Sequence, residues 1–184
     1  METKMTPAKL GCALMASLAM VLATRAASAA PQNPTDAAAA LLDRAQIEDM
    51  LTDYYGHLGG GADRNLDSYY LEDGVLDVNG VVARGRKAID DLYKSLAAHS
   101  PGLQGKFHML LNNPKIAVQG DTATVDVIWT GVLSETPQAT PRILEQGREH
   151  DELVKRSGRW FFKNRVITSD GGMPATFEKT YKDR

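Results

Sequence analysis

Apolar and polar residues alternate with a helical period in the first half of this chain and with a strand period in the second half. From Leu41 the apolar residues recur every three or four positions, which is typical of a helix with one buried face. The members of this stripe are Ile47, Leu51, Tyr54 and Leu58. Three glycines, 59–61, follow directly, and because glycine is favoured after a helix, they predict its end.

Two further helices and one hairpin are predicted before the long strands begin. The second helix is expected over 65–70 and the third over 86–98. The buried stripe of the third helix consists of Ala88, Ile89, Leu92 and Leu96. Residues 75–78 and 81–83 flank Asn79-Gly80, a dipeptide that suits the type I′ turn of a hairpin.

Four longer segments, rich in Val, Ile, Thr and aromatic residues, predict strands over 106–119, 122–133, 142–156 and 159–168. Gly120-Asp121 and Ser157-Gly158 supply turns between them. Strands joined by such turns pair antiparallel. Three helices followed by a four-stranded antiparallel meander indicate an α+β fold.

The first residues follow a different pattern. Lys4 and Lys9 precede an uncharged apolar run over 10–23, and Ala27-Ser28-Ala29 follows it. This order predicts a secretory signal peptide over 1–29, cleaved after Ala29, and hence a periplasmic or secreted protein. The run is shorter than the roughly 20 residues that span a bilayer. The alternative is an uncleaved membrane anchor.

Composition is informative once the leader is set aside. Of 184 residues 43% are hydrophobic and 24% charged, which excludes a mostly disordered chain. Removing Glu2, Lys4, Lys9 and Arg25 leaves 18 basic and 22 acidic residues, so nothing suggests nucleic-acid binding. The single cysteine, Cys12, lies in the leader, so the mature chain has no disulfide framework. We therefore expect a flexible linker over 30–40, one domain over 41–168 and a polar tail over 169–184.

Several segments, in this order, resemble the SnoaL-like group of the NTF2-like superfamily. They are 47–54, 70–74, 83–85, His108 with Asn112, 118–123, and 151–160 with Arg165. The resemblance covers about residues 41–168. It implies a curved antiparallel sheet, wrapped into a cone by three N-terminal helices, with a pocket inside. Members include isomerases, dehydratases, cyclases and binding modules, so the fold alone does not name a reaction.

His108, Tyr54 and Glu149 are the predicted catalytic residues. The resemblance places His108 where related dehydratases and lyases carry a pocket histidine, and an imidazole exchanges protons near neutral pH. Tyr54 matches the family's pocket tyrosine, whose hydroxyl would donate a hydrogen bond to a developing oxyanion. The alternatives are a buried structural histidine and a core tyrosine.

Glu149 and Asp151 alternate with His150, so both carboxylates lie on one face of their strand. For both, the alternative is a solvated surface position. Arg165 resembles the family's pocket arginine and would hold an anionic substrate group, the alternative being an ion pair with Asp151 or Glu149. The predicted substrate-binding residues are Arg165, Tyr55, Tyr69, Asn112, Trp129 and Asp151.

The chain departs from the family pattern at one position. Related dehydratases and isomerases carry a catalytic aspartate about five residues after the helix-one tyrosine, whereas this chain has Gly59 and no carboxylate before Asp63. The base must therefore come from elsewhere. The four histidines are scattered without metal-ligand spacing, so no metal and no cofactor are expected.

The predicted function is that of a cofactor-independent lyase that uses general acid–base catalysis on a small hydrophobic or aromatic molecule. The Tyr/His pocket without the aspartate is similar to that of sphingomonad diarylpropane and phenylcoumaran lyases, which implies a lignin-derived diarylpropane with loss of formaldehyde. One alternative is a dehydratase or isomerase of a polycyclic or steroid-like substrate. Another is a non-catalytic periplasmic ligand-binding protein. A homodimer through the sheet is expected, with Val125, Val127 and Trp129 at its interface.

Overall fold

The computed structural model describes residues 34–58, 65–99 and 106–172. The predicted signal peptide over 1–29, Gly59 and Asp63 lie outside these residues. Among the helices of the described ranges, none has the length and apolar character needed to cross a membrane.

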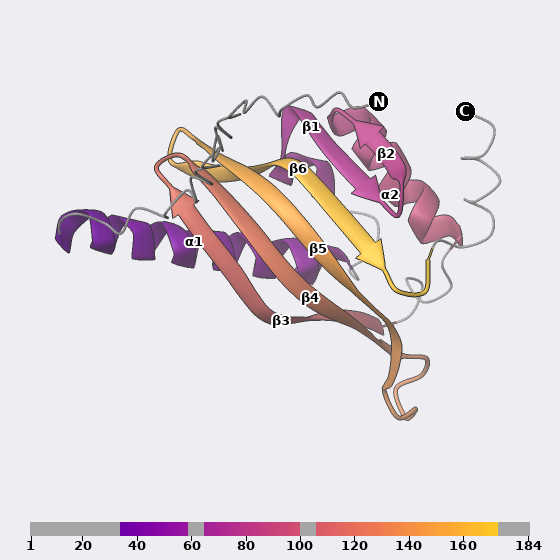
Figure 1. Cartoon of the computed structure of the whole chain (residues 1–184). Helices are drawn as coiled ribbons and strands as arrows, with labels where there is room; N and C mark the ends of the chain where they lie inside the picture. The colour runs from indigo at the N-terminus through magenta and orange to yellow at the C-terminus, as the bar shows by residue number, and fades with distance from the viewer. Residues whose placement is uncertain (1–33, 59–64, 100–105, 173–184) are drawn as a thin grey trace, which may run out of the picture. The chain divides into compact units, whose positions relative to one another are not determined.

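The predicted long elements are confirmed, with small changes at their ends (Figure 1). They are α1 (Pro34–Leu58), the 3-10 turn η1 (Leu66–Tyr69), β1 (Tyr70–Val78), β2 (Val81–Arg84), α2 (Arg86–His99), β3 (Lys106–Gln119), β4 (Thr122–Ser134), β5 (Arg142–Arg156) and β6 (Arg159–Ser169).

Two predictions about the N-terminal helices are wrong. The flexible linker expected over 30–40 is helical from Pro34 onward, because proline is favoured in a first helical turn and four alanines then extend the helix. The second helix is only the 3-10 turn η1, which follows the left-handed Asn65 and leads straight into β1. The described residues thus contain two α-helices instead of three.

The six strands form one sheet in the order β2-β1-β6-β5-β4-β3 (Figure 1). The meander β3 to β6 is antiparallel as predicted, but β1 pairs parallel with β6, so the sheet is mixed. The end of β6 is also fixed by Asn79, whose Oδ1 accepts a hydrogen bond from the Ser169 amide at 3.0 Å.

One face of the sheet, called here the inner face, is covered by α1. The buried residues of α1 are Ile47, Met50, Leu51, Tyr54 and Tyr55, which confirms most of the predicted stripe. Residues of adjacent strands that share the inner face form rows across the sheet. In the Asp151 row these are Val125, Asp151, Arg165 and Leu76, and in the Glu149 row Val127, Glu149, Ile167 and Val78. The Gly147 row consists of Leu111, Trp129, Gly147 and Ser169, and the Glu145 row of Met109, Gly131 and Glu145.

The opposite, outer face carries large exposed apolar residues, among them Leu110, Ile128 and Val82. The stripe expected at a dimer interface, Val125, Val127 and Trp129, is instead buried on the inner face, with at most 4% of each residue exposed. Alternation along β4 explains this, because the apolar odd-numbered residues point to the core and the even-numbered ones outward.

Candidate functional site

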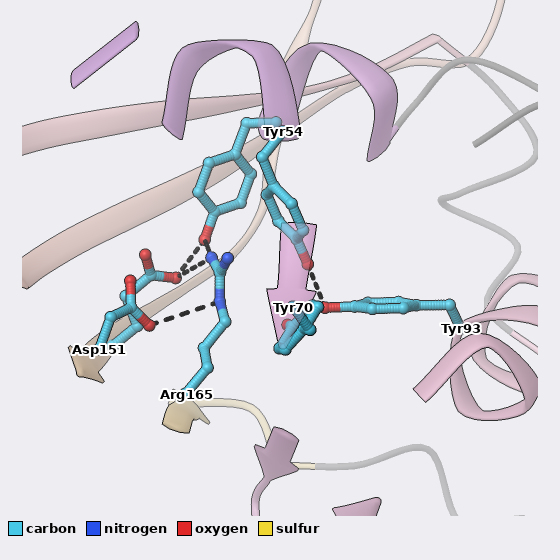
Figure 2. A network of polar contacts seen from close by, with 7 residues as sticks. Tyr54, Tyr70, Tyr93, Asp151 and Arg165 are labelled. Carbon is cyan, nitrogen blue, oxygen red and sulfur yellow. Dashed lines mark hydrogen bonds and ion pairs between the residues drawn. The ribbon is translucent and has the colours of Figure 1, made fainter. Parts of the chain in front are cut away.

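A cluster of charged side chains lies buried between α1 and the sheet (Figure 2). Arg165 comes from β6, Glu149 and Asp151 from β5, and Tyr54 and Tyr55 from α1. Arg165 and Asp151 are fully buried, and Glu149 is 3% exposed. They face α1 because the two-residue strand period aligns them with Val125 and Leu76, the apolar members of the Asp151 row.

The Arg165 guanidinium is the centre of this cluster. Its Nη2 donates hydrogen bonds to the Tyr55 hydroxyl at 2.6 Å and to Glu149 Oε2 at 2.7 Å. The Tyr55 hydroxyl in turn donates to Glu149 Oε2. Asp151 Oδ1 forms an ion pair with Arg165 Nε at 3.6 Å. The guanidinium carbon lies 4.2 Å from the Tyr54 ring centroid and 4.4 Å from that of Phe162, so both rings contribute cation–π contacts.

One cation faces two carboxyl groups, and this excess of carboxyl groups over cations determines where a proton is held. Burial raises the pKa of Asp151 well above its usual value, and the Glu149 carboxylate raises it further against the opposing effect of Arg165. Burial alone would lower the pKa of Arg165, but Glu149 and the neighbouring tyrosines outweigh it, so the pKa is raised. Arg165 therefore stays charged, while Asp151 is the member that most readily holds a proton.

Three tyrosines form a second buried network beside the cation (Figure 2). The hydroxyl of Tyr93, from α2, hydrogen-bonds with that of Tyr54 and with that of Tyr70 at 3.0 Å. Burial raises the pKa of each of these phenols and of Tyr55. All four hydroxyls consequently remain protonated, with their hydrogen bonds made inside the cluster.

Several buried polar atoms of the cluster have no hydrogen-bond partner. They are Arg165 Nε and Nη1, Glu149 Oε1, and both carboxyl oxygens of Asp151. Buried polar atoms are nearly always paired in folded proteins, because an unpaired one loses its bonds to water without replacement. Of these atoms, Arg165 Nε and Asp151 Oδ1 face each other across the 3.6 Å ion pair, so Arg165 Nη1, Glu149 Oε1 and Asp151 Oδ2 are left without a polar partner.

The structure brings together five of the nine predicted site residues, namely Tyr54, Tyr55, Glu149, Asp151 and Arg165. The expected alternative for Arg165, an ion pair with Glu149 or Asp151, is also present, but with both partners buried. Tyr69 packs edge-to-face on Tyr54 with 5.4 Å between ring centroids, and its hydroxyl lies 3.2 Å from His57 Nδ1. Trp129 lies two rows away from Arg165, in the Gly147 row.

His108 and Asn112 do not join the site. The inward positions of β3 belong to Phe107, Met109 and Leu111, so the two-residue period places His108 and Asn112 on the outer face, where both are exposed. Asn112 Nδ2 donates to Thr130 Oγ1 at 3.2 Å and borders an outer-face groove of about 470 Å³. The sheet itself separates His108 from Tyr54, so the predicted His/Tyr pair is not formed.

Sequence reasoning missed Tyr93 and Phe162. Tyr93 carried a usable signal, since it follows Ile89 by four residues and therefore shares the buried stripe of α2. Phe162 is part of an ordinary strand pattern, and nothing in that pattern indicates a cation above its ring.

The described residues contain no group of three His, Cys, Asp or Glu side chains that would hold a metal ion. Asp126 Oδ1 and His150 Nδ1 lie 2.6 Å apart, within hydrogen-bond distance, on the outer face.

Comparisons with known proteins identify the fold. The family model described as a SnoaL-like domain matches residues 39–166. Similar solved structures include an NTF2-like protein with a cystatin-like fold from Novosphingobium aromaticivorans (22% identity, 83% of this chain and 99% of that one, TM-score 0.59). A candidate scytalone dehydratase from the same organism is also similar (24%, 73% and 87%, 0.58). So is a Mycobacterium tuberculosis protein of unknown function (23%, 77% and 78%, 0.62). Among curated proteins, none matches the sequence. At these identities the structures establish the α+β cone fold of NTF2-like proteins.

Proposed function

Because the chain belongs to the SnoaL-like domain family, we propose that it is a cofactor-independent enzyme that performs general acid–base chemistry on a small aromatic molecule. The observation that carries this proposal is the buried pair Glu149 and Asp151, which share one guanidinium and are close enough to couple. Such a pair offers a proton donor and a proton acceptor in one water-poor site.

Within the pair, Glu149 is the group that meets the substrate. The side chains of Glu149, Asp151 and Arg165 are all fully buried, but Glu149 shares its row with the half-buried Ile167 and so lies one row nearer the partly buried end of the inner face than Asp151. Glu149 Oε1 is unpartnered, while Oε2 is held by Arg165 and Tyr55. Glu149 therefore acts on the substrate, and Asp151 behind it supplies and recovers the proton.

A gradient of exposure supports access from one end of the inner face. The Asp151 row is fully buried throughout, whereas Ile167 in the Glu149 row is half-buried. Leu111 in the Gly147 row and Met109 in the Glu145 row are also half-buried. An apolar ligand that enters past Met109 and Leu111 reaches Glu149 before any other carboxyl of the cluster.

The finer proposal is a lyase that acts on a lignin-derived diarylpropane. The pair protonates the benzylic hydroxyl, which leaves as water while the para phenol releases its proton to solvent water, and a quinone methide forms. Glu149 then accepts the proton of the terminal hydroxyl. As formaldehyde departs, the electrons of the broken C–C bond restore the aromatic ring as a phenolate, which regains a proton. Across both steps the pair gives one proton and takes one.

The same machinery suits a dehydratase or isomerase, the class suggested by the similar fold of a candidate scytalone dehydratase. A dehydration also needs a proton delivered to a leaving hydroxyl and another removed from carbon. What separates the two proposals is the product, since a dehydratase releases water alone and the lyase releases formaldehyde as well.

The test incubates the purified protein with a diarylpropane and with hydroxylated aromatic substrates, and assays formaldehyde and dehydrated products. Glu149→Gln keeps the shape of the side chain but removes its basicity, so turnover should fall about a hundredfold or more. His108→Ala on the outer face is the matched control and should leave turnover unchanged. If ligands bind without any turnover in either form, the non-catalytic ligand-binding protein is supported instead.

We also propose that the protein is exported and that it forms a homodimer. The leader over 1–29 supports a periplasmic or secreted protein. The exposed Leu110 and Ile128 support a homodimer through the outer face, because burying them would remove apolar surface from water.

A further inference from the structure

A second polar group lies on the inner face, apart from the Arg165 cluster, around Gly147. Trp129 of β4 and Ser169 of β6 lie beside this glycine in adjacent strands, and Glu145 precedes it by two residues on the same face. Ser169 Oγ donates a hydrogen bond to Glu145 Oε2 at 3.0 Å. This group, which consists of Trp129, Ser169 and Glu145, is called here the Trp129 subsite.

Gly147 makes room for this arrangement. A Cβ atom at this position would lie 2.3 Å from Cζ2 and 2.7 Å from Cε2 of Trp129, so the indole ring lies directly against the strand backbone. Only glycine permits that approach. The indole nitrogen is bonded to Cε2 and therefore lies close to the Gly147 backbone on the inner face.

Two properties of the Trp129 subsite indicate a ligand. Trp129 is 2% exposed and its Nε1 has no hydrogen-bond partner, which is unusual because a buried indole N–H normally finds one. Glu145 is half-buried, and burial raises its pKa despite the hydrogen bond from Ser169. A hydroxyl group satisfies both residues, because its oxygen accepts from the indole N–H while its hydrogen is donated to the carboxyl. A carbonyl or an ammonium satisfies only one of them.

The spacing along β5 sets the length of the ligand. Glu145 and Glu149 are four residues apart on the same face, which corresponds to about 13 Å at the usual rise of a strand. Between them lie the Trp129 ring and the half-buried Leu111 and Ile167. The path between the two carboxyl groups is therefore apolar and partly lined by an aromatic ring.

We propose that the Trp129 subsite binds a hydroxyl at the far end of an elongated, two-ring aromatic ligand whose reacting end lies at Glu149. This rests on the proposed function for the reacting end and adds the substrate class: an elongated two-ring molecule with a hydrogen-bonding group at each end. The chain thus selects its ligand by length as well as by polarity.

The test measures binding of two probes by calorimetry: biphenyl with a hydroxyl at both para positions, and biphenyl with a hydroxyl at one. A hydrogen bond to a carboxyl in a partly buried site makes the dihydroxy probe bind about tenfold more tightly to the native protein. In Glu145→Ala this preference disappears, and affinity for the monohydroxy probe stays the same. Trp129→Phe, which keeps a ring but loses the N–H, should also reduce the preference.

Glu152→Ala, on the same strand but the outer face, is the matched control and keeps the tenfold preference. Thermal unfolding of each variant verifies folding. Equal binding of both probes to the native protein overturns the subsite and leaves the proposed function intact, whereas binding of neither contradicts both. A protein that turns nothing over but prefers the dihydroxy probe supports the subsite and contradicts only the proposed reaction.

Discussion

Asp151 illustrates how single residues determine the chemistry of this protein. Its carboxyl group is fully buried beside another carboxyl, and one guanidinium serves both. Burial and like charge both favour the neutral acid, so the fold maintains a protonated carboxyl where an exposed aspartate would be ionised. The same burial and like charge also make the stability of the fold depend on pH.

The sign of that dependence follows from the raised pKa of Asp151. Between the pKa of an unfolded aspartate, about 3.9, and the higher native pKa of Asp151, the folded state binds more protons than the unfolded state. Stability from this group is therefore complete below the unfolded pKa and is lost as pH rises through the native pKa. Asp151→Asn does not titrate and should remove the effect.

Urea unfolding at about pH 5 and about pH 8 measures the difference, which reaches at most about 1.4 kcal/mol per pH unit for one group. The native protein should lose stability toward the higher pH relative to Asp151→Asn. Asp73→Asn, at an exposed position of β1, is a control that keeps the native profile. Parallel profiles for native protein and Asp151→Asn would contradict a protonated Asp151.

At the scale of elements, the strand period decides which side chains meet. Every strand of the meander was predicted, and the helical stripe that places Tyr54 inward was read from spacing alone. The face of each strand was the weaker inference. His108 is the case in point, because Phe107, Met109 and Leu111 are all apolar and settle the inward face of β3. A comparison of these three residues with the alternate positions, His108, Leu110 and Asn112, would have placed His108 outward.

Pairing between distant elements was beyond the sequence. The parallel contact of β1 with β6 joins segments about ninety residues apart, and neither segment carries a pattern that specifies the other. The charge cluster depends on it in part, since Leu76 of β1 completes the Asp151 row beside Arg165. Likewise, Glu149 and Asp151 were seen to share a face, but their burial depends on α1 covering that face.

Gly147 provides a test at this scale. Gly147→Ala inserts a methyl group into the space of the Trp129 ring and near the Thr168 carbonyl oxygen, and should destabilise the fold by about 1–3 kcal/mol. Gly56→Ala on the exposed side of α1 is the control, since nothing lies within 4 Å of the added carbon. Alanine is the better helix former, so this variant should gain about 0.5–1 kcal/mol. Urea unfolding of both variants gives the comparison, and equal stabilities would contradict the close packing.

At the scale of the whole molecule, the two faces of the sheet have separate tasks. The inner face carries the charge cluster, the Trp129 subsite and the core, whereas the outer face carries exposed apolar residues among charged ones. A domain whose sheet is covered on one side only gains stability when a second copy covers the other. This division is the basis of the first of two predictions at this scale.

Ile128→Arg places a charge in the middle of the outer face, where 59% of the isoleucine is exposed. If copies pair through this face, the variant should be monomeric in light scattering while the native protein is dimeric. Leu42→Arg, at a 61% exposed position on α1, should remain dimeric. A native monomer, or a dimer unaffected by Ile128→Arg, argues against pairing at this face.

The leader gives the second prediction. Expressed in a bacterium with a periplasm, the full chain should yield a mature protein that begins at Ala30, as determined by N-terminal sequencing. Ala27→Arg and Ala29→Arg disrupt the small-residue site and should leave the precursor uncleaved. A mature protein that retains residue 1 in the native form contradicts a signal peptide.

The buried tyrosines have a spectroscopic consequence. Of the six tyrosines in the chain, Tyr54, Tyr55, Tyr70 and Tyr93 lie inside the domain with raised pKa values. Their near-ultraviolet absorbance therefore stays that of the phenol as alkali is added to the folded protein, and becomes that of the phenolate only when the fold opens. An alkaline titration thus turns the protein into its own optical indicator of unfolding, with no dye or label required.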